Sequence, residues 1–456
     1  MLGVKKTTLT GKEKRRIVQF DGFGQTKDGK DLLAAEYYNC DCRDGILRGG
    51  IGLKQCYDAN GKELTVGMSI SDGALHTFFT TWNRDGGQAN STKIYLVSID
   101  GYLYLRREET GVGERKVALG NHVEHCALKM ENGVVHNFFC GSKGAYGTLD
   151  GATFHNILAV ECRGACICGK RYVMLTKNGE VVYTAPLAPQ DKSGDTPDGM
   201  GVVYLPVRYG APIGMKGYGD SAYVFFERGI CKMNFFASAK ENTLTEIPYH
   251  GGEICPYAQA TTKDGILFLA REGAYYLRND KVERVCEHLP IGPCSVEKSA
   301  NVGYCEDVVI FAYYKEKGDS TQAQCVAIYT DGKDGYFTGV EGVLGGNGYV
   351  YLNGKIHRFA KDSVGVAHAK SSFFESVPLN FGRCGRKRLK SIAVYGEGRV
   401  VIGVKSGDKE RTYTLNMDKG VDKTRLLDSG REFSLRFNLE AGSVVTGVEM
   451  EYVMEK

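Results

Sequence analysis

The chain has 456 residues and a formal net charge of only +4, which excludes the strongly basic composition of a general nucleic-acid binder. Glycine (60 residues) and tyrosine (27) are frequent and proline (10) is rare, a composition that favours an all-β protein of short strands. No run of about 18 apolar residues occurs, so we predict no membrane span, and Met1–Lys6 lacks the apolar core of a signal peptide.

The first predicted region is an N-terminal arm, residues 1–60. It is basic near its start, where Lys12, Lys14, Arg15 and Arg16 lie close together. We interpret residues 1–20 either as a solvated terminus or as an arm that docks on a neighbouring subunit.

The second region, residues 61–369, repeats a unit of strand, glycine turn and strand. Its clearest copy contains Ile266–Ala270, Ala274–Leu277 and Lys281–Val285, which predict three consecutive antiparallel strands. The turn glycines recur at spacings near the roughly 40–50 residues of a propeller blade; they are Gly101, Gly144, Gly179, Gly229, Gly273 and Gly354. We predict a β-propeller of about seven blades, because radial packing buries both faces of each sheet. The alternative is a series of β-sandwiches.

The end of the repeat predicts how the ring closes. After residue 359 the pattern stops, which leaves the last sheet without an edge strand. Leu47, Ile51 and Leu53 alternate along residues 46–57, before the first full unit. We predict that this segment or a neighbouring stretch forms a strand in the same sheet as residues 348–359, since the pairing satisfies edge hydrogen bonds.

From residue 370 the alternation of apolar and polar residues becomes cleaner. We predict a small antiparallel β-sandwich over residues 370–456. Its five expected strands are Ser391–Tyr395, Arg399–Val404, Arg411–Leu415, Glu432–Leu439 and Val448–Tyr452.

Fifteen cysteines without a signal peptide indicate a reducing compartment. The densest cluster, Cys162, Cys166 and Cys168, supplies only half of a zinc motif, so we predict reduced, buried strand thiols and no metal or other cofactor. The Cys40-Asp41-Cys42 segment is interpreted in the same way. His122–Cys126 lacks the helical spacing of a zinc site and is interpreted as a polar loop or strand end.

One charged run is a candidate for partner contact. Arg383, Arg386, Lys387, Arg388 and Lys390 lie where the C-terminal region begins. They suit contact with phosphate or an acidic partner surface, and the alternative is a solvated connection between domains. No base-stacking aromatic residues interleave them, so we predict no sequence-specific nucleic-acid binding.

In its order of features the chain resembles the propeller-bearing virion proteins of tailed bacteriophages that act as tail hub or stabilise packaged DNA. The resemblance rests on Phe20-x-Gly22, Glu36–Asn39, Leu47–Gly49 and Lys390–Gly398, together with the propeller that lacks sharp motifs. It implies a structural role in oligomeric rings that plug or extend the portal channel. The chain departs from the family in its many cysteines and its extra C-terminal sandwich.

Two functional hypotheses follow. The first is a non-enzymatic structural protein of a phage or prophage virion, assembled in the bacterial cytoplasm as part of a head–tail connector or tail hub. Its expected partners are portal or tail proteins and further copies of the chain, with no membrane. The alternative is a carbohydrate-active or carbohydrate-binding propeller with a C-terminal sugar-binding sandwich. A glycoside hydrolase needs two carboxylates at a fixed separation, and no motif singles out such a catalytic pair.

Overall fold

The computed structural model of the chain describes residues 13–17, 20–21, 32–57, 61–65, 73–84, 88–97, 101–106, 113–129, 135–149, 151, 153–188, 199–236, 238–317, 323–338, 348–361, 372–381, 384–440 and 442–455. Within these ranges the chain is all-β, and its helical segments are three 3-10 helices, Arg43–Gly45 (η1), Val207–Tyr209 (η2) and Ala239–Glu241 (η3). None of them is long and apolar enough to cross a membrane.

The chain divides into two compact units. Unit 1 comprises Met1–Lys54, Asp334–Glu341 and Phe359–Lys456, and unit 2 comprises Gln55–Lys333 and Gly342–Arg358. The predicted divisions at residues 60 and 369 therefore differ from the observed ones, because the N-terminal segment belongs mostly to the same unit as the C-terminal region.

The predicted meander forms β24 (Gly265–Ala270), β25 (Gly273–Arg278) and β26 (Lys281–Val285), which pair in this order after β23 (Ile254–Thr262). Every residue of β24 is buried, which explains why its sequence is continuously apolar rather than alternating. Asn279 and Asp280, in the turn before β26, have φ of 46° and 59°, the conformation that two-residue hairpin turns require.

Four more sheets of the described chain have the same plan, each with four antiparallel strands in chain order. The first contains β11 (Glu124–Lys129), β12 (Val135–Gly141), β13 (Gly144–Thr148) and β14 (His155–Leu158). The second contains β15 (Cys162–Cys168), β16 (Arg171–Thr176), β17 (Glu180–Tyr183) and β18 (Gly201–Tyr204). The third contains β19 (Pro212–Tyr218), β20 (Ser221–Phe226), β21 (Gly229–Asn234) and β22 (Thr243–Ile247). The fourth contains β27 (Asn301–Cys305), β28 (Val308–Tyr313), β29 (Gln324–Tyr329) and β30 (Gly335–Phe337).

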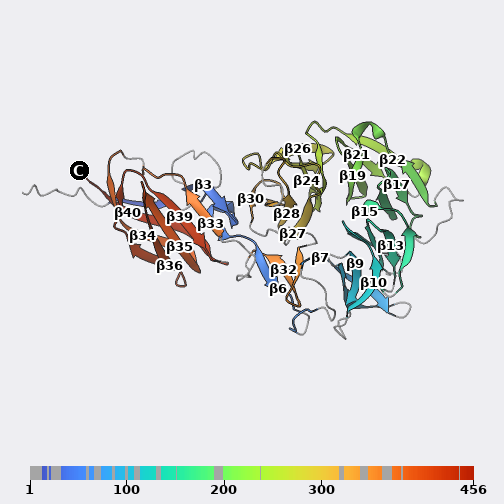
Figure 1. The fold of residues 1–456 in the computed structure, drawn as a ribbon, viewed down its shortest axis with the longest axis horizontal. Coiled ribbons are helices and arrows are strands. Elements are labelled where there is room, and N and C mark those ends of the chain that lie inside the picture. Colours follow the sequence, from blue (N-terminus) through green and yellow to red (C-terminus); the bar gives the residue numbers. More distant parts are fainter. Residues whose placement is uncertain are drawn as a thin grey trace, which may run out of the picture. The chain divides into compact units, whose positions relative to one another are not determined.

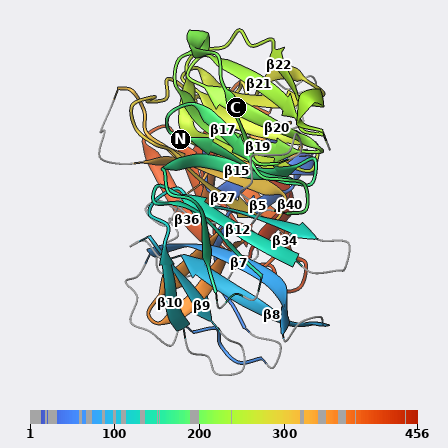
Figure 2. The ribbon, with the colours of Figure 1, turned by 90° about the vertical axis from the view of Figure 1, so that its right-hand side faces the viewer.

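The successive sheets are arranged around a common centre (Figure 1), and Figure 2 shows them from the side. Apolar side chains fill the space between them. Phe138 of β12 stacks on Tyr172 of β16 with ring centroids 4.3 Å apart, and Phe225 of β20 contacts Phe268 of β24 at 5.3 Å. Separate buried clusters join β15–β17 to β19–β21 and β20 to β24. Unit 2 is therefore a β-propeller, as the sequence predicted; its number of blades stays a prediction.

The ring closes through a seven-stranded sheet in the order β10-β9-β8-β7-β31-β32-β6. Its strands are β6 (Gly52–Gln55), β7 (Gly73–Arg84), β8 (Gln88–Val97), β9 (Tyr102–Arg106), β10 (Gly113–Ala118), β31 (Tyr349–Leu352) and β32 (Lys355–Ala360). The predicted pairing of residues 46–57 with 348–359 is thus present, in β6 and β32. The start of β7 also pairs with β31, through Leu75 and Tyr349, so segments from the early part of the chain hold the last hairpin on both sides.

Unit 1 contains two sheets drawn from both ends of the chain. One has the order β37-β34-β40-β5-β4, with β1 on β40 and β38 on β34, and the other has the order β2-β3-β33-β39-β35-β36. The early strands are β1 (Glu13–Ile17), β2 (Phe20–Asp21), β3 (Leu32–Tyr38), β4 (Cys40–Asp41) and β5 (Leu47–Gly49). The late strands are β33 (Ser372–Ser376), β34 (Lys387–Glu397), β35 (Arg399–Ser406), β36 (Lys409–Asn416), β37 (Val421–Arg425), β38 (Ser429–Gly430), β39 (Ser434–Leu439) and β40 (Val444–Met454).

The predicted sandwich is therefore completed by N-terminal strands. Both interpretations of residues 1–20 need correction where the structure describes them, because β1 pairs with β40 of its own chain, Lys14 opposite Glu451 and Arg16 opposite Glu449. Residues 1–12 lie outside the described ranges.

Candidate functional site on the propeller axis

The first strand of each four-stranded sheet lies toward the middle of the ring (Figure 1), where β11, β15, β19, β23 and β27 pack on one another in that order. Two glycines permit this close approach. A Cβ atom on Gly164 would lie 2.7 Å from the Met215 amide nitrogen, and one on Gly217 would lie 2.8 Å from the Cys166 Cβ. These positions exclude any side chain, so the inner strands are set at backbone contact.

A bulge in β23 projects a tyrosine toward the axis. Ile254 pairs with Ala270 but Gln259 pairs with Phe268, so the residues between them leave the ladder. The Gln259 amide donates to the Cys255 carbonyl at 2.8 Å and closes the bulge. Tyr257, at its tip, has φ of 58°.

Tyr257 stacks on His122, which precedes β11 and itself has φ of 56°. The ring centroids are 3.5 Å apart and the planes differ by 2°. Bulky residues rarely adopt positive φ, and such conformations persist where the surroundings over-determine them. The stack therefore joins the sheet of β11 to the sheet of β23 across the ring.

A charged pair makes a second connection. Lys216 of β19 donates a hydrogen bond to the Glu124 carboxylate of β11, and their side chains are 18% and 29% exposed. Burial lowers the pKa of Lys216, but its contact with Glu124 outweighs burial, so the net shift is upward and the lysine stays charged. Tyr304 of β27 lies close enough for both charges to affect its hydroxyl, and although 37% of the residue is exposed, desolvation of the hydroxyl raises its pKa.

We call His122, Glu124, Lys216, Tyr257 and Tyr304 the axial cluster. Burial lowers the pKa of His122 to about 4 and raises the pKa of Tyr257, so the stacked rings are uncharged at neutral pH. One neutral stack and one ion pair connect three sheets, and Tyr304 of a fourth sheet lies near the ion pair. These contacts brace the ring, meaning that they hold non-adjacent sheets together and use the charged groups for that purpose.

Other charges beside the axial cluster also have partners. The Arg163 Nη1 donates to the Pro212 carbonyl at 2.9 Å, and Glu161 accepts from the Lys177 Nζ at 3.1 Å. Glu124 and Glu161 are thus both ion-paired. A pair of unpaired carboxylates, as glycoside hydrolysis needs, is not formed by these two residues.

Sequence reasoning missed this site. It assigned His122–Cys126 to a polar loop or strand end and gave no role to Lys216, Tyr257 or Tyr304. The available signal was a polar or aromatic residue near the start of successive repeat units. A second signal was Pro256, because proline inside a strand occurs at edges or bulges, and it directly precedes Tyr257.

The N-terminal motif forms a buried polar node inside unit 1. Asn39 is 2% exposed, with φ of 49°. Its side-chain oxygen accepts from the Ile51 amide at 3.1 Å and from the Thr338 hydroxyl at 2.9 Å, and its backbone amide donates to the Phe337 carbonyl at 2.7 Å. Ser372 accepts from the Gly50 amide at 3.2 Å. The node thus ties together three segments that are distant in sequence.

The basic run does not act as one surface. Lys387 is buried and donates to the carbonyls of Gly385 (3.0 Å) and Arg431 (2.9 Å), which corrects its assignment to partner contact. Inward and outward positions alternate along β34, so one charge of the run turns inside. Arg386 pairs with Glu455 at 3.2 Å, Arg388 is exposed and Lys390 is half-buried. Arg383 lies outside the described residues.

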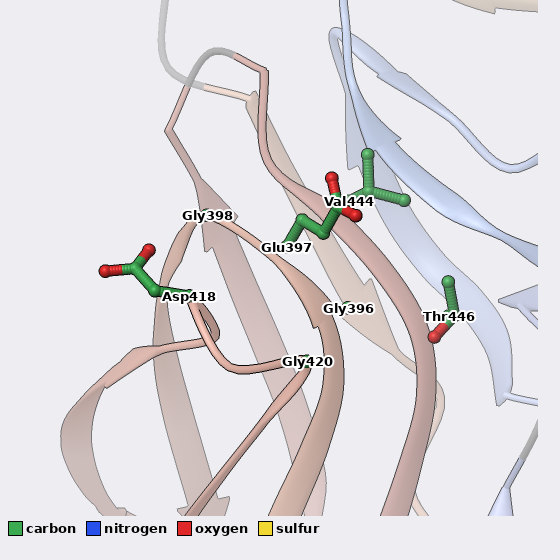
Figure 3. A pocket seen from close by; sticks show the side chains of 7 residues that line it. All are labelled: Gly396, Glu397, Gly398, Asp418, Gly420, Val444 and Thr446. Atoms are coloured by element: carbon green, nitrogen blue, oxygen red, sulfur yellow. The ribbon is translucent and has the colours of Figure 1, made fainter.

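A pocket of about 720 Å³ opens in unit 1. Its described lining contains no aromatic ring, and the Glu397 and Asp418 carboxylates point in different directions (Figure 3). The lining residues are Gly396, Glu397, Gly398, Asp418, Gly420, Val444 and Thr446. Sugar sites commonly stack an aromatic ring on the sugar, so this pocket gives no support to a sugar-binding sandwich.

The cysteines are free thiols. Cys40, Cys162, Cys166 and Cys168 are buried, as predicted, and Cys42 is half-buried. Within the described ranges, no group of three or more His, Cys, Asp or Glu side chains could hold a metal ion.

No protein-family model and no curated protein matches the chain. Among solved structures, U3-55K is similar over 60% of this chain and 83% of its own, with 11% identity and a TM-score of 0.35. The extracellular domain of the proposed hybrid two-component system BT3049 from B. thetaiotaomicron is similar over 91% of this chain and 61% of its own, with 11% identity and a TM-score of 0.42.

Proposed function

We propose that the chain is a non-enzymatic structural protein of a phage or prophage virion that acts in head–tail or tail-hub assembly through protein–protein contacts. The observation that carries the proposal is the axial cluster. At the place where a catalytic propeller would gather free polar groups, the charges of Glu124 and Lys216 are bound to each other and His122 is covered by Tyr257. A braced axis suits a module that presents its outer surfaces to partners.

The N-terminal motif supports the same role. Glu36–Asn39 and Leu47–Gly49, which carry the resemblance to tailed-phage virion proteins, flank the buried node of Asn39 and Gly50. The Asn39 side chain and the Gly50 amide are used in internal hydrogen bonds, so this part of the motif serves the fold.

The proposed partners are portal or tail proteins and further copies of the chain. In the described part of the basic run, Arg388 is exposed and Lys390 half-buried. Such cations suit an acidic partner surface through charge complementarity, which acts mainly on association rate and specificity.

The test is a strain that carries the phage or prophage with this gene deleted, complemented by plasmid copies. Wild-type protein should restore infectious tailed particles, and mass spectrometry should find it in gradient-purified particles. The Arg388→Glu/Lys390→Glu variant should restore fewer particles, whereas Lys409→Glu, a charge reversal at an exposed position of β36, should behave as wild type. Normal tailed particles from the deletion strain, or particles without the protein, would overturn the proposal.

The glycoside hydrolase alternative has its own readout. Purified protein should release no product from a panel of aryl glycosides, and Glu124→Gln should not change that result. Turnover that is lost in Glu124→Gln, with the melting temperature of the variant unchanged, would favour the enzyme.

A further inference from the structure

Two histidines meet between neighbouring propeller sheets. The rings of His136 on β12 and His155 on β14 have centroids 6.0 Å apart and planes inclined by 41°. Phe138, two residues after His136, contacts the His136 ring edge-on at 5.4 Å and stacks on Tyr172 of β16. Because residues i and i+2 of a strand share a face, His136 faces the sheet of β15–β18.

The His136 ring is a buried polar group with unused capacity. The residue is 4% exposed, and neither ring nitrogen has a hydrogen-bond partner among the described residues. An imidazole ordinarily uses one nitrogen as donor and the other as acceptor. Buried polar nitrogens without protein partners are rare, and a bound water or ion is their usual explanation.

The position of His155 is fixed by a glycine opposite it. Gly147 is the register partner of His155 on β13. A Cβ atom at Gly147 would lie 2.6 Å from the His155 Nε2, so any side chain there would displace the ring. The glycine therefore leaves the His155 ring beside His136.

We propose that His136 and His155 together bind one borderline transition-metal cation of the Zn²⁺ or Ni²⁺ class, with water completing its coordination. Imidazole nitrogen suits these ions, whereas Ca²⁺ and Mg²⁺ prefer oxygen ligands. At a tetrahedral angle, two Zn–N bonds of about 2.1 Å place the ligand nitrogens about 3.4 Å and the ring centroids about 5.3 Å apart, so the two rings, now 6.0 Å apart, need to approach only slightly.

The chemistry of the side chain suits a metal ligand, because an imidazole nitrogen that carries no proton has a lone pair to donate. With two protein ligands the site binds more weakly than a closed structural zinc site of four.

The experiment titrates ZnCl₂ into chelator-treated protein by calorimetry, in a Cys384→Ser background that removes the exposed thiol. We expect one saturable site whose affinity falls at least about tenfold in His155→Gln, since even second-shell losses cost metal sites that much. Gly147→Ala keeps both histidines but displaces His155, and it should weaken binding too. His250→Gln, at an exposed histidine, is the matched control and should titrate as wild type.

A direct measurement on the wild-type protein avoids any variant that fails to fold. Anomalous diffraction at the zinc edge should place the ion between the His136 and His155 rings. Zinc found only at thiols or at other histidines, or wild-type titration of His155→Gln, would overturn the proposal. Neither result bears on the virion role, because this inference rests only on the two histidines and their surroundings.

Discussion

The two units of the chain are built from the same kind of strand by opposite routes. In unit 2 each four-stranded sheet is one continuous stretch, such as β11–β14, and only the closing sheet joins distant segments. In unit 1 the strands beside β40 come from both ends of the chain, β1 and β5 from one and β34 from the other. Unit 2 is assembled mainly from local hairpins, whereas unit 1 depends on pairing between strands that are distant in sequence.

The largest expected effect comes from removing residues 1–60, which deletes β1–β6. Both sheets of unit 1 and the closing sheet of unit 2 lose strands, so we expect the free energy of unfolding to fall by more than about 5 kcal/mol, beyond the usual range of single substitutions. Thermal unfolding followed by circular dichroism measures this. Removal of residues 1–12 alone keeps every described strand and is the control. A truncated chain that melted cooperatively at the wild-type temperature would show that closure comes from elsewhere.

A substitution at the polar node should act on unit 1 first. In Gly50→Ala the new Cβ would lie 2.2 Å from both the backbone and the side-chain oxygen of Asn39. We expect a loss of about 3 kcal/mol, typical of severe overpacking in a core. Trp82, the single tryptophan, lies in unit 2, so its fluorescence reports separately on the propeller. If Gly50→Ala lowered the midpoint of the tryptophan transition as much as the midpoint of the circular dichroism transition, the two units would not unfold separately.

At the propeller axis, Lys216→Met should leave the Glu124 carboxylate in a low-dielectric site without its cation. The pair is partly exposed, so we expect a loss of about 2 kcal/mol, less than for a fully buried ion pair. Urea unfolding by Trp82 fluorescence measures it. Adding Glu124→Gln to Lys216→Met should recover part of the loss, since the double variant has no unpaired charge. Equal stability of Lys216→Met and the wild type would show that the ion pair does not brace the ring.

The His122–Tyr257 stack predicts a dependence on pH. Burial holds the pKa of folded His122 near 4, below its ordinary value of 6.5, so the unfolded chain binds the proton more readily. The stabilisation is therefore present above pH 6.5 and is lost as pH falls toward 4. His122→Phe keeps an aromatic ring but cannot titrate, so its stability should fall less steeply over this window. If the free energy of unfolding fell equally steeply with pH in the wild type and in His122→Phe, the proposed role of His122 would be refuted.

The smallest effect is expected on the rim of unit 2. Arg228, Glu253, Arg271 and Glu316 form a line of alternating charges, with 3.0 Å from Arg228 Nε to Glu253 and 3.2 Å from Arg271 Nε to Glu316. These arginines are well exposed, so water and salt screen the pairs. Arg228→Gln should leave the melting temperature unchanged within error. A clear drop would mean that the rim contributes as much as the axis.

The repeat was predictable because the strands of each four-stranded sheet follow one another in the sequence. Strand-length runs such as Gly265–Ala270, ended by turn residues, reveal a hairpin without knowledge of the rest of the chain. Ring closure was predictable for a related reason: the last hairpin lacked an edge strand, and an alternating segment near the start of the chain lacked a partner. Both inferences use local patterns and the need to satisfy backbone hydrogen bonds.

The remaining features depend on contacts that sequence patterns do not encode. The sequence of Glu13–Ile17 does not indicate that β40 is its partner, so this basic segment resembled a loose arm. The inward turn of Lys387 follows from strand register, which a run of charges hides. The axial cluster depends on positive φ at His122 and Tyr257, a conformation that both residue types usually avoid.

The mixed origin of unit 1 has a consequence for synthesis on the ribosome. The β1 and β5 strands emerge early, but β40 ends only at Met454. At about 5–20 residues per second, the early strands wait on the order of tens of seconds for their partner, with unpaired edges that other chains can meet. The propeller sheets fold behind them as they emerge. Unit 1 can form only from a chain translated as far as β40, so prematurely terminated products lack it and are distinguishable from finished ones before any assembly step.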